Sequence, residues 1–484
     1  MELRGLEPLT PTLPVWCATN CATAPGRLFM VHGGGLGSSG GRKGWGGVFD
    51  PVAEGMSVDE RAAVQQRRLR ELVGRLLAVG GVQAERLRAA GVEAGAAVTL
   101  ADLAELPTTS KLDLWDHYPF GMLAVPREHV VAVHGSSGTG GRPTLVAYTR
   151  GDLELWAAMC ARALAAAGTT PGSIVHNAYG YGLFTGGLGI HQGAIALGAT
   201  VVPVSGGFTQ RQLTLLRDLR PDILTCTPSY AVYLGEALRA AGMDRDGISL
   251  RAGVFGAEPW TDGLRAQLEE LLPVKAVDIY GLSEVIGPGV ACECIEAQSG
   301  LHVNEDHFLV ETLDIDTGRP TAPGVPGELT FTTPTKQALP LLRYRTGDVA
   351  SLDPGPCACG RTLVRMSKVT GRVDDMLVVR GVNVYPSEVE AVLLAHPGVA
   401  PHYLVVVDRR TPATRLLVVC EVDGETRTAG AQTADALADA LLQRLGLHAE
   451  VVIVPPGTVP RTEVGKARRR VDWTGGEPPL AGLS

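Results

Sequence analysis

A run of small residues at 135–141 is the part of the chain whose composition most directly indicates chemistry. Residues 134–144 read H-G-S-S-G-T-G-G-R-P-T, and apolar segments flank them at 130–133 and 145–148. The pattern predicts a strand, a loop and a second strand. Glycines let several backbone N–H groups point at one place, and hydroxyls add donors, so the loop suits an anion such as a phosphate. A plain flexible hairpin is the alternative that this segment alone leaves open.

Two carboxylates farther along the chain stand in glycine-containing motifs. Glu284 stands in V-D-I-Y-G-L-S-E-V-I-G-P-G, after a predicted strand that ends at Tyr280. A carboxylate among glycines suits a hard cation that also contacts phosphate oxygens, although a surface acid would look the same in sequence. Asp348 ends L-R-Y-R-T-G-D, and its carboxylate can accept two hydrogen bonds at once.

Four further residues are good zinc ligands: Cys294, His302, Cys357 and Cys359. Three thiolates and one imidazole would form a closed, structural tetrahedron and not a catalytic site. Cys292 could replace Cys294 in this set, His307 is a spare ligand, and reduced cysteines in turns are the alternative. With nine cysteines in a chain that shows no export signal, reduced thiols or metal ligation are expected in place of a disulfide framework.

Residues 150–275 alternate between helical and short apolar patterns. Helices are predicted at 152–166, 187–197, 209–219, 229–241 and 261–272, and strands at 174–178, 200–204, 223–226 and 252–255. This alternation predicts an α/β fold with mostly parallel strands. Ligands of such sheets sit in loops beyond the carboxyl ends of the strands, which here are 179–187, 205–208 and 256–260.

The loop at 136–144 resembles the S-S-G-T-x-G-x-P-T loop of the adenylate-forming superfamily of acyl-CoA ligases and luciferases, and in particular its phenylacetate–CoA ligase branch. Arg142 replaces the usual lysine, so charge is kept but geometry differs. The resemblance implies a large N-terminal adenylate-forming α/β domain with mostly parallel sheets, expected at 48–373. It also implies a small mobile α+β lid at 374–484, with helices at 387–394 and 434–445 and strands at 403–407, 416–421 and 450–453.

The resemblance also implies roles for individual residues. Lys466, Glu284 and Arg372 would be catalytic, with Glu284 on Mg²⁺. Residues that would contact ATP or AMP are Ser136, Ser137, Gly138, Thr139, Gly140, Gly141, Arg142, Gly256, Ala257, Glu258, Tyr280, Gly281, Asp348 and Arg372. Residues that would line the acid pocket are Tyr179, Phe184, Gly186, Gly281 and Pro288.

In the lid, Asp374 would be the hinge, and Arg380 and Gly381 would line the coenzyme A tunnel. Lys466 matches the mobile lysine of the superfamily, although Val464 is an extra residue between Arg461 and Gly465 compared with the branch pattern. In isolation, the basic run at 460–470 would be read as a solvated face.

The function implied is ATP-dependent conversion of an aromatic acid to an acyl-AMP, followed by transfer to coenzyme A. An alternative acceptor is the phosphopantetheine thiol of a carrier protein. A degenerate nucleotide-binding module is disfavoured because Glu284, Asp348 and Lys466 are all present. The cofactor expectations are ATP, Mg²⁺, coenzyme A and a structural Zn²⁺.

The net charge of −8 argues against a general nucleic-acid binder, and no segment is apolar enough to span a bilayer. A cytoplasmic protein is expected, and a homodimer stays open. Residues 1–47 are glycine-rich and lack an amphipathic stripe. They contain G-x-G-x-x-G at 35–40 without the helix that a dinucleotide site needs. We expect this segment to be a disordered or mis-started extension.

Overall fold

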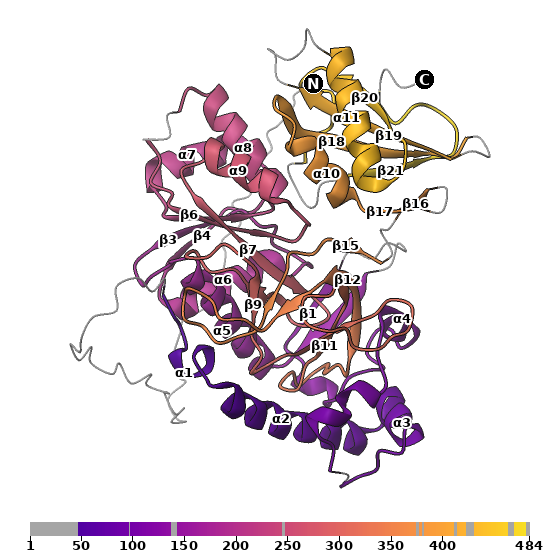
Figure 1. The fold of residues 1–484 in the computed structure, drawn as a ribbon. Helices are drawn as coiled ribbons and strands as arrows, with labels where there is room; N and C mark the ends of the chain where they lie inside the picture. The colour runs from indigo at the N-terminus through magenta and orange to yellow at the C-terminus, as the bar shows by residue number, and fades with distance from the viewer. Residues whose placement is uncertain are drawn as a thin grey trace, which may run out of the picture. The chain divides into compact units, whose positions relative to one another are not determined.

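The computed structural model describes residues 47–95, 97–136, 143–243, 247–373, 377–379, 382–410, 414–422, 430–462 and 469–480. Figure 1 follows them from indigo α1 to the yellow C-terminal strands. None of the helices in these ranges is both long and apolar enough to cross a membrane.

A nine-stranded mixed sheet is the centre of the large domain. Its strand order is β13-β14-β9-β8-β7-β6-β5-β3-β4. The parallel strands are β3 (Ile174–Asn177), β4 (Thr200–Pro203), β5 (Ile223–Cys226), β6 (Ala252–Gly256) and β7 (Lys275–Leu282). The antiparallel strands are β8 (Gly287–Cys292), β9 (Leu301–Val303), β13 (Leu352–Asp353) and β14 (Arg365–Met366). Parallel pairing, as predicted from the α/β alternation, therefore holds from β3 to β7 and changes to antiparallel beyond β7.

The predicted helices between these strands are confirmed, with small shifts at their ends. They are α5 (Arg150–Ala166), α6 (Gly186–Leu197), α7 (Thr209–Leu219), α8 (Pro228–Ala240) and α9 (Asp262–Leu271). α5 begins with a capping box, in which Thr149 and Asp152 satisfy one another's backbone N–H groups. The prediction for β7 was short by two residues, because Tyr280 lies inside the strand and not at its end.

A second, four-stranded antiparallel sheet carries the L-R-Y-R-T-G-D segment. Its strands are β10 (Leu309–Leu313), β11 (Gly327–Thr332), β12 (Tyr344–Ala350) and β15 (Gly371–Arg372). The glycine-rich loop joins a separate hairpin, β1 (Ala132–Ser136) and β2 (Thr144–Tyr148), as predicted. Ser136 pairs with Thr144 and is therefore the last strand residue, not a loop residue as the sequence suggested.

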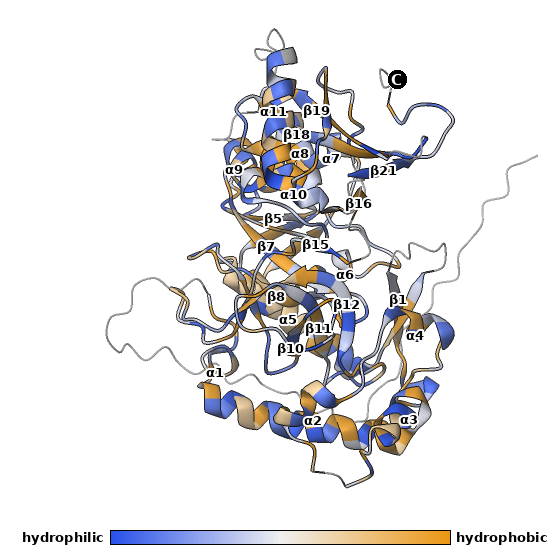
Figure 2. Cartoon of the chain, turned by 45° about the vertical axis from the view of Figure 1, so that its right-hand side comes forward, coloured by the Kyte–Doolittle hydropathy of each residue, from blue (hydrophilic) through white to orange (hydrophobic). Residues whose placement is uncertain are grey.

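The N-terminal part of the described chain is helical. It comprises α1 (Pro51–Glu54), α2 (Val58–Val79), α3 (Gly81–Ala89), η1 (Leu100–Glu105), α4 (Lys111–Asp116) and η2 (Arg127–His129). Ser57 caps α2 through a capping box with Glu60. Apolar and polar residues alternate along α2 in Figure 2, and its residues Leu69, Leu72, Leu76 and Leu77 are buried.

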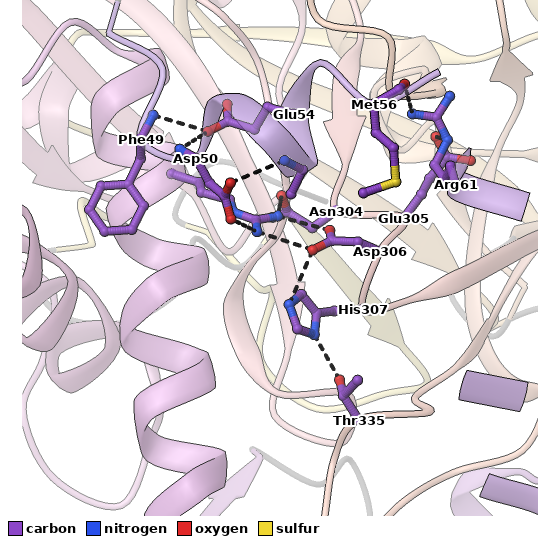
Figure 3. A network of polar contacts seen from close by, with 12 residues as sticks. Phe49, Asp50, Glu54, Met56, Arg61, Asn304, Glu305, Asp306, His307 and Thr335 are labelled. Carbon is purple, nitrogen blue, oxygen red and sulfur yellow. Dashed lines mark hydrogen bonds and ion pairs between the residues drawn. The ribbon is translucent and has the colours of Figure 1, made fainter. Parts of the chain in front are cut away.

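A polar network ties α1 to the large domain. The Arg162 guanidinium donates to both carboxylate oxygens of Asp306, at 2.8 and 3.0 Å, and to Asp50 at 2.9 Å. Figure 3 shows His307 next in this chain of contacts, between Asp306 and Thr335. Asp50, the N-cap of α1, is thereby held against α5.

The C-terminal part contains a second mixed sheet of order β20-β19-β18-β21. Its elements are β18 (Val399–Asp408), β19 (Arg415–Val422), β20 (Glu450–Val454), β21 (Arg470–Trp473), α10 (Pro386–Leu394) and α11 (Gly430–Leu445). A small hairpin, β16 (Leu377–Val379) and β17 (Val382–Val384), precedes them. The predicted helices and three strands are confirmed, while the sequence reading missed β16, β17 and β21.

Candidate active site

Glu284 lies in the turn between β7 and β8. Its side chain contacts Ser136, where the glycine-rich loop begins. Glu284 is 3% exposed, and its Oε1 accepts a hydrogen bond of 2.9 Å from the Ser136 hydroxyl. The Lys111 ammonium lies 3.9 Å from the same oxygen. The Ser283 hydroxyl donates to the Gly135 carbonyl at 3.3 Å, which gives a second link between the two segments. The structure thus brings together Glu284 and Ser136, two residues that belong to different sequence motifs.

Tyr280 of β7, Asp348 of β12 and Arg372 of β15 form a second group. The Tyr280 hydroxyl donates to Asp348 Oδ2 at 2.7 Å, and Arg372 donates to Asp348 Oδ1 at 2.8 Å. Burial raises the pKa of Tyr280 well above its usual value, and the charge of Asp348 adds to the shift, so the phenol keeps its proton and donates. Antiparallel pairing of Asp348 with Arg372 fixes the register that makes this contact.

An open pocket lies beside this group and is lined by the ends of β6 and β7. Ala257, Glu258, Tyr280, Gly281, Asp348 and Arg372 are among its lining residues. Gly256, the last residue of β6, directly precedes the pocket residue Ala257. A Cβ on Gly256 would lie 2.1 Å from the Ile279 carbonyl oxygen, so only glycine allows β6 and β7 to approach at this point. Glu258 also accepts a 2.7 Å hydrogen bond from the Ser229 amide, at the start of α8.

The residues predicted for an acid pocket fall into two contacting pairs and one separate residue. A Cβ on Gly186 would lie 3.4 Å from the Tyr179 ring, and Gly281 pairs with Pro288 between β7 and β8. A Cβ on Gly281 would lie 1.9 Å from the Gly287 carbonyl oxygen, so this crossing also needs glycine. Tyr179 is buried, whereas Phe184 is 55% exposed.

Ten of the predicted site residues lie outside the described residues. They are Ser137, Gly138, Thr139, Gly140, Gly141, Arg142, Asp374, Arg380, Gly381 and Lys466. Their roles stay predictions.

Four charged residues near the site were missed by sequence reasoning. Lys111 and Lys336 lie near Glu284, while Asp278 and Lys368 line the open pocket. Burial raises the pKa of Asp278 to about 7, and the neighbouring charge of Glu293 adds to this shift. Burial lowers the pKa of Lys336 to about 8, against the opposing charges of Asp152 and Glu284. Lys336 stands between Thr335 and Gln337, and this polar context gives no sign of burial.

The predicted zinc ligands come together at the other end of β8. Cys294, His302, Cys357 and Cys359 each offer an atom, and all four atoms lie within 4.8 Å of one another. The two sulfurs of Cys294 and Cys357 are 3.7 Å apart, and Cys359 Sγ lies 3.4 Å from His302 Nε2. A tetrahedral zinc ion with ordinary bond lengths would give edges of about 3.8 and about 3.6 Å, so the cluster has the size of a zinc site.

The chemistry of the cluster agrees with its size. A contact between Cys294 and Cys359, together with His302, lowers the pKa of the Cys359 thiol, while the same contact raises the pKa of the Cys294 thiol, so Cys359 is the one of these two that first becomes the thiolate. Cys292 is buried but does not belong to the group, and His307 contacts Asp306 and Thr335 instead. Neither of the two substitutes considered from the sequence therefore joins the cluster.

Comparison with known proteins agrees with this geometry. The family described as AMP-binding enzyme matches residues 72–337, and AMP-binding enzyme C-terminal domain matches residues 381–473. A phenylacetate-coenzyme A ligase of Thermus thermophilus is 49% identical over 88% of this chain and 99% of its own length. One from Escherichia coli is 47% identical over 88% of this chain and 97% of its own length.

A solved structure of 2-hydroxyisobutyryl-CoA ligase in its postadenylation state is also similar. It has a TM-score of 0.82 and 27% identity, and the match covers 88% of this chain and 92% of that chain. The extent of these matches, together with the carboxylate turn and the Tyr280–Asp348–Arg372 group, shows that the chain belongs to the AMP-binding enzymes and is an AMP-forming acid–CoA ligase like its phenylacetate–CoA ligase relatives.

Proposed function

We propose that this protein activates an aromatic carboxylic acid, with phenylacetate as the first candidate, and transfers the acyl group to coenzyme A. The observation that carries the proposal is the carboxylate turn itself. Glu284 is held against Ser136 and lies on the same segment as Tyr280. The Tyr280 hydroxyl donates to Asp348, which also accepts from Arg372. That segment therefore offers one group for phosphates and another for a ribose.

In the first half-reaction, a carboxylate oxygen of the acid would attack the α-phosphorus of ATP. The bond between that phosphorus and the oxygen bridging to the β-phosphate breaks, and pyrophosphate leaves. Both reactants are anions, so their repulsion must be neutralised. We assign this task to the loop at 136–142 and to Lys466, which would lie between the acid and the α-phosphate. Arg372 would neutralise charge on the nucleotide side.

Glu284 would hold Mg²⁺, which neutralises phosphate charge when it is bound. Its carboxylate is a hard oxygen ligand beside a serine hydroxyl, at the point where the loop begins, and this environment suits Mg²⁺. Asp348 would accept both ribose hydroxyls, and Gly256, Ala257 and Glu258 would lie against the adenine. In this arrangement, Tyr280 and Arg372 orient the Asp348 carboxylate from two sides.

The acid would lie near Tyr179, Gly186, Gly281 and Pro288, with Phe184 at the outer edge. Tyr179 presents a buried aromatic ring, and aromatic rings pack favourably against aryl groups. The curated relatives in Thermus thermophilus and Escherichia coli are named phenylacetate-coenzyme A ligases, which supports an aryl acid as substrate.

In the second half-reaction, the thiol sulfur of coenzyme A would attack the acyl carbon. AMP leaves with the electrons of the broken acyl–oxygen bond, and the thiol proton goes to solvent. We assign the hinge of the required lid rotation to Asp374 and the thiol tunnel to Arg380 and Gly381. A carrier-protein pantetheine arm is the alternative acceptor, because it presents the same thiol.

An acid panel tests the proposal. Pyrophosphate release is measured with ATP, Mg²⁺ and single acids, with and without coenzyme A, using phenylacetate, benzoate-type, aminobenzoate and hydroxyaryl acids. We expect release with an aryl acid and thioester only when coenzyme A is present. Adenylate without thioester would point to a carrier protein, and failure of release with every acid would favour a degenerate nucleotide-binding module.

Two further assignments accompany this function. We propose that the Cys294, His302, Cys357 and Cys359 cluster holds one structural Zn²⁺, as its size and chemistry support. A reaction that consumes ATP and coenzyme A fits a protein of the cytoplasm. The homodimer stays a prediction, which sedimentation equilibrium would test.

A further inference from the structure

Lys336 is a fully buried charged side chain whose burial the mechanism above does not explain. It is 0% exposed and lies in the connection between β11 and β12. Its ammonium donates a 2.8 Å hydrogen bond to the main-chain carbonyl of Glu284 and lies 5.2 Å from the centre of the Tyr148 ring. Within the described residues, no carboxylate oxygen forms an ion pair with it. Desolvating an ammonium is costly, and an apolar side chain would fill the same space more cheaply.

The backbone around Lys336 is clamped on both sides. Arg75 of α2 donates to the carbonyls of Pro334, at 2.6 Å, and Lys336, at 3.2 Å. Asp152 of α5 accepts hydrogen bonds from the amides of Gln337, at 2.6 Å, and Ala338, at 2.9 Å. The ammonium is therefore carried to a fixed place by two helices that are far apart in sequence.

Tyr148 also contacts the turn that carries Glu284. Its hydroxyl donates to the carbonyl oxygens of Ser283, at 3.3 Å, and Ile286, at 3.1 Å. Together with Lys336, it therefore engages three main-chain carbonyls of the turn from Ser283 to Ile286. The Glu284 carboxylate projects from this turn toward Ser136 and Lys111.

We propose that Lys336 and Tyr148 are a positioning pair, which fixes the Glu284 turn and thereby sets its affinity for the divalent cation that accompanies ATP. The pair acts through main-chain contacts and does not touch the substrates. This inference rests on the proposed function, because it takes Glu284 as the cation ligand. Groups behind a metal ligand commonly change metal affinity by about 10- to 100-fold when removed.

The test measures how strongly Mg²⁺ and ATP bind together, without turnover. Calorimetric titration of ATP, with no acid present, is done once with saturating Mg²⁺ and once with a chelator. The ratio of the two dissociation constants gives the coupling between cation and nucleotide. We expect Lys336→Met to reduce this ratio by about 10- to 100-fold. ATP binding in the presence of the chelator should change little.

Tyr148→Phe provides a second variant, because it keeps the ring and removes only the hydroxyl. We expect it to reduce the ratio by roughly fivefold, the effect of one neutral hydrogen bond. Thioester formation from premade acyl-adenylate should stay normal in both variants, because that step needs no pyrophosphate release. If Lys336→Met does not fold, the result for Tyr148→Phe decides.

Gln83→Leu is a matched control for damage to the same connection. The Gln83 side chain is buried and hydrogen-bonds Pro340 and Leu342, farther along the chain from Lys336. We expect this variant to lose stability and to keep the coupling ratio. If it lowered the ratio as much as Lys336→Met does, the effect would be general loosening of the connection, and the proposal would be overturned.

Glu284→Gln separates failure of this inference from failure of the proposed function. If Glu284→Gln reduces the coupling but neither Lys336→Met nor Tyr148→Phe does, the positioning role is wrong and the function stands. If Glu284→Gln leaves the coupling intact, Glu284 is not the cation ligand and the positioning role falls with it. If the unmodified protein releases no pyrophosphate with any acid, the proposed function itself is overturned, together with this role.

Discussion

The two ends of strand β8 show how one scaffold supports two different kinds of site. Before β8, Glu284 lies near the Ser136 hydroxyl, where the glycine-rich loop begins, and near the Lys111 ammonium. After β8, Cys294 joins three other ligand atoms that face one another. In the proposed function, the carboxylate of the first arrangement meets a ligand that binds and leaves. The second gathers four possible ligand atoms, and with the proposed zinc ion it would act as a permanent cross-link.

This difference predicts that changes at the two ends will appear in different measurements. Variants on the nucleotide side should change the rate of a half-reaction with little effect on unfolding. Variants in the Cys/His cluster should change unfolding and metal content with little effect on the chemical step. The following predictions are ordered from the largest expected effect to the smallest.

Lys466→Ala should give the largest effect, on adenylate formation alone. Removing one electrostatic donor of this kind typically costs about 10²–10³ in rate. Supplied with premade aryl-adenylate, the same variant should still form thioester. Arg470→Ala is the control from the same basic run, because Arg470 is paired with Asp472. Normal adenylation by Lys466→Ala would show that another group reaches the α-phosphate. The match of Lys466 to the mobile lysine of the superfamily, across the extra residue Val464, would then be wrong.

Gly381→Leu is the reciprocal of the first prediction. Adenylation should proceed, and thioester formation should stall by about 10²-fold, because a 1 Å misplacement of reacting groups already has an effect of that order. Both half-reactions are followed by pyrophosphate release and by thioester absorbance. Equal loss of both half-reactions in this variant and in Lys466→Ala would remove the assignment of a rotating lid from Asp374 onward.

Removing the metal should break the other side of the comparison. We expect about one zinc per chain by elemental analysis, the content of a single closed site. Cys357→Ser should lower the free energy of unfolding by roughly 4 kcal/mol, the stabilisation by a ligand held at about a thousand times its Kd. Cys420→Ser is the control, since Cys420 is buried outside the cluster. Absence of zinc, with the cluster thiols freely titratable in the folded protein, would end the zinc assignment.

His307→Gln should change how the free energy of unfolding depends on pH. Burial lowers the pKa of His307 to about 4, although the charge of Asp306 opposes the shift. The unfolded chain, with a histidine pKa of about 6.5, binds this proton more readily, so stability is lost as the pH falls from about 6.5 toward 4. The histidine should account for a loss on the order of 2–3 kcal/mol over this range.

Chemical denaturation at several pH values measures this effect. The glutamine variant should show a smaller loss of stability on acidification, because its amide can still contact Asp306 and Thr335 without titrating. His129→Gln is the control, since His129 is exposed. Identical pH profiles for the wild type and His307→Gln would contradict the prediction. Activity near neutral pH should be the same in all three proteins.

Removal of residues 1–47 should have the smallest effect. The described contact that would be lost is a 3.2 Å hydrogen bond from Arg361 to the Gly47 carbonyl. Such a bond contributes about 1 kcal/mol, while the ion pairs of Asp50 and Glu54 would remain. A protein that begins at Val48 should therefore fold and adenylate normally. Loss of either property would place the domain boundary earlier in the chain.

Much of the architecture could be predicted because it depends on local patterns. The alternation of helices and strands from Arg150 to Leu271 follows from apolar periodicity and caps, and the structure confirms it. The shift from parallel to antiparallel pairing beyond β7 could not be predicted in this way. Pairing depends on which strands meet, and a strand carries no local sign of its neighbour's direction.

The sequence by itself determined the family, the order of its motifs and the residue types available for chemistry. These follow from identity and spacing, as in the carboxylate of Glu284 among glycines. Only the tertiary structure decided which residues meet. It buries Lys336 beside Glu284, pairs Arg162 with Asp306, and selects Cys294 over Cys292 for the cluster. Burial and long-range contact depend on segments that are tens of residues or more apart, and no local pattern encodes where those segments will pack.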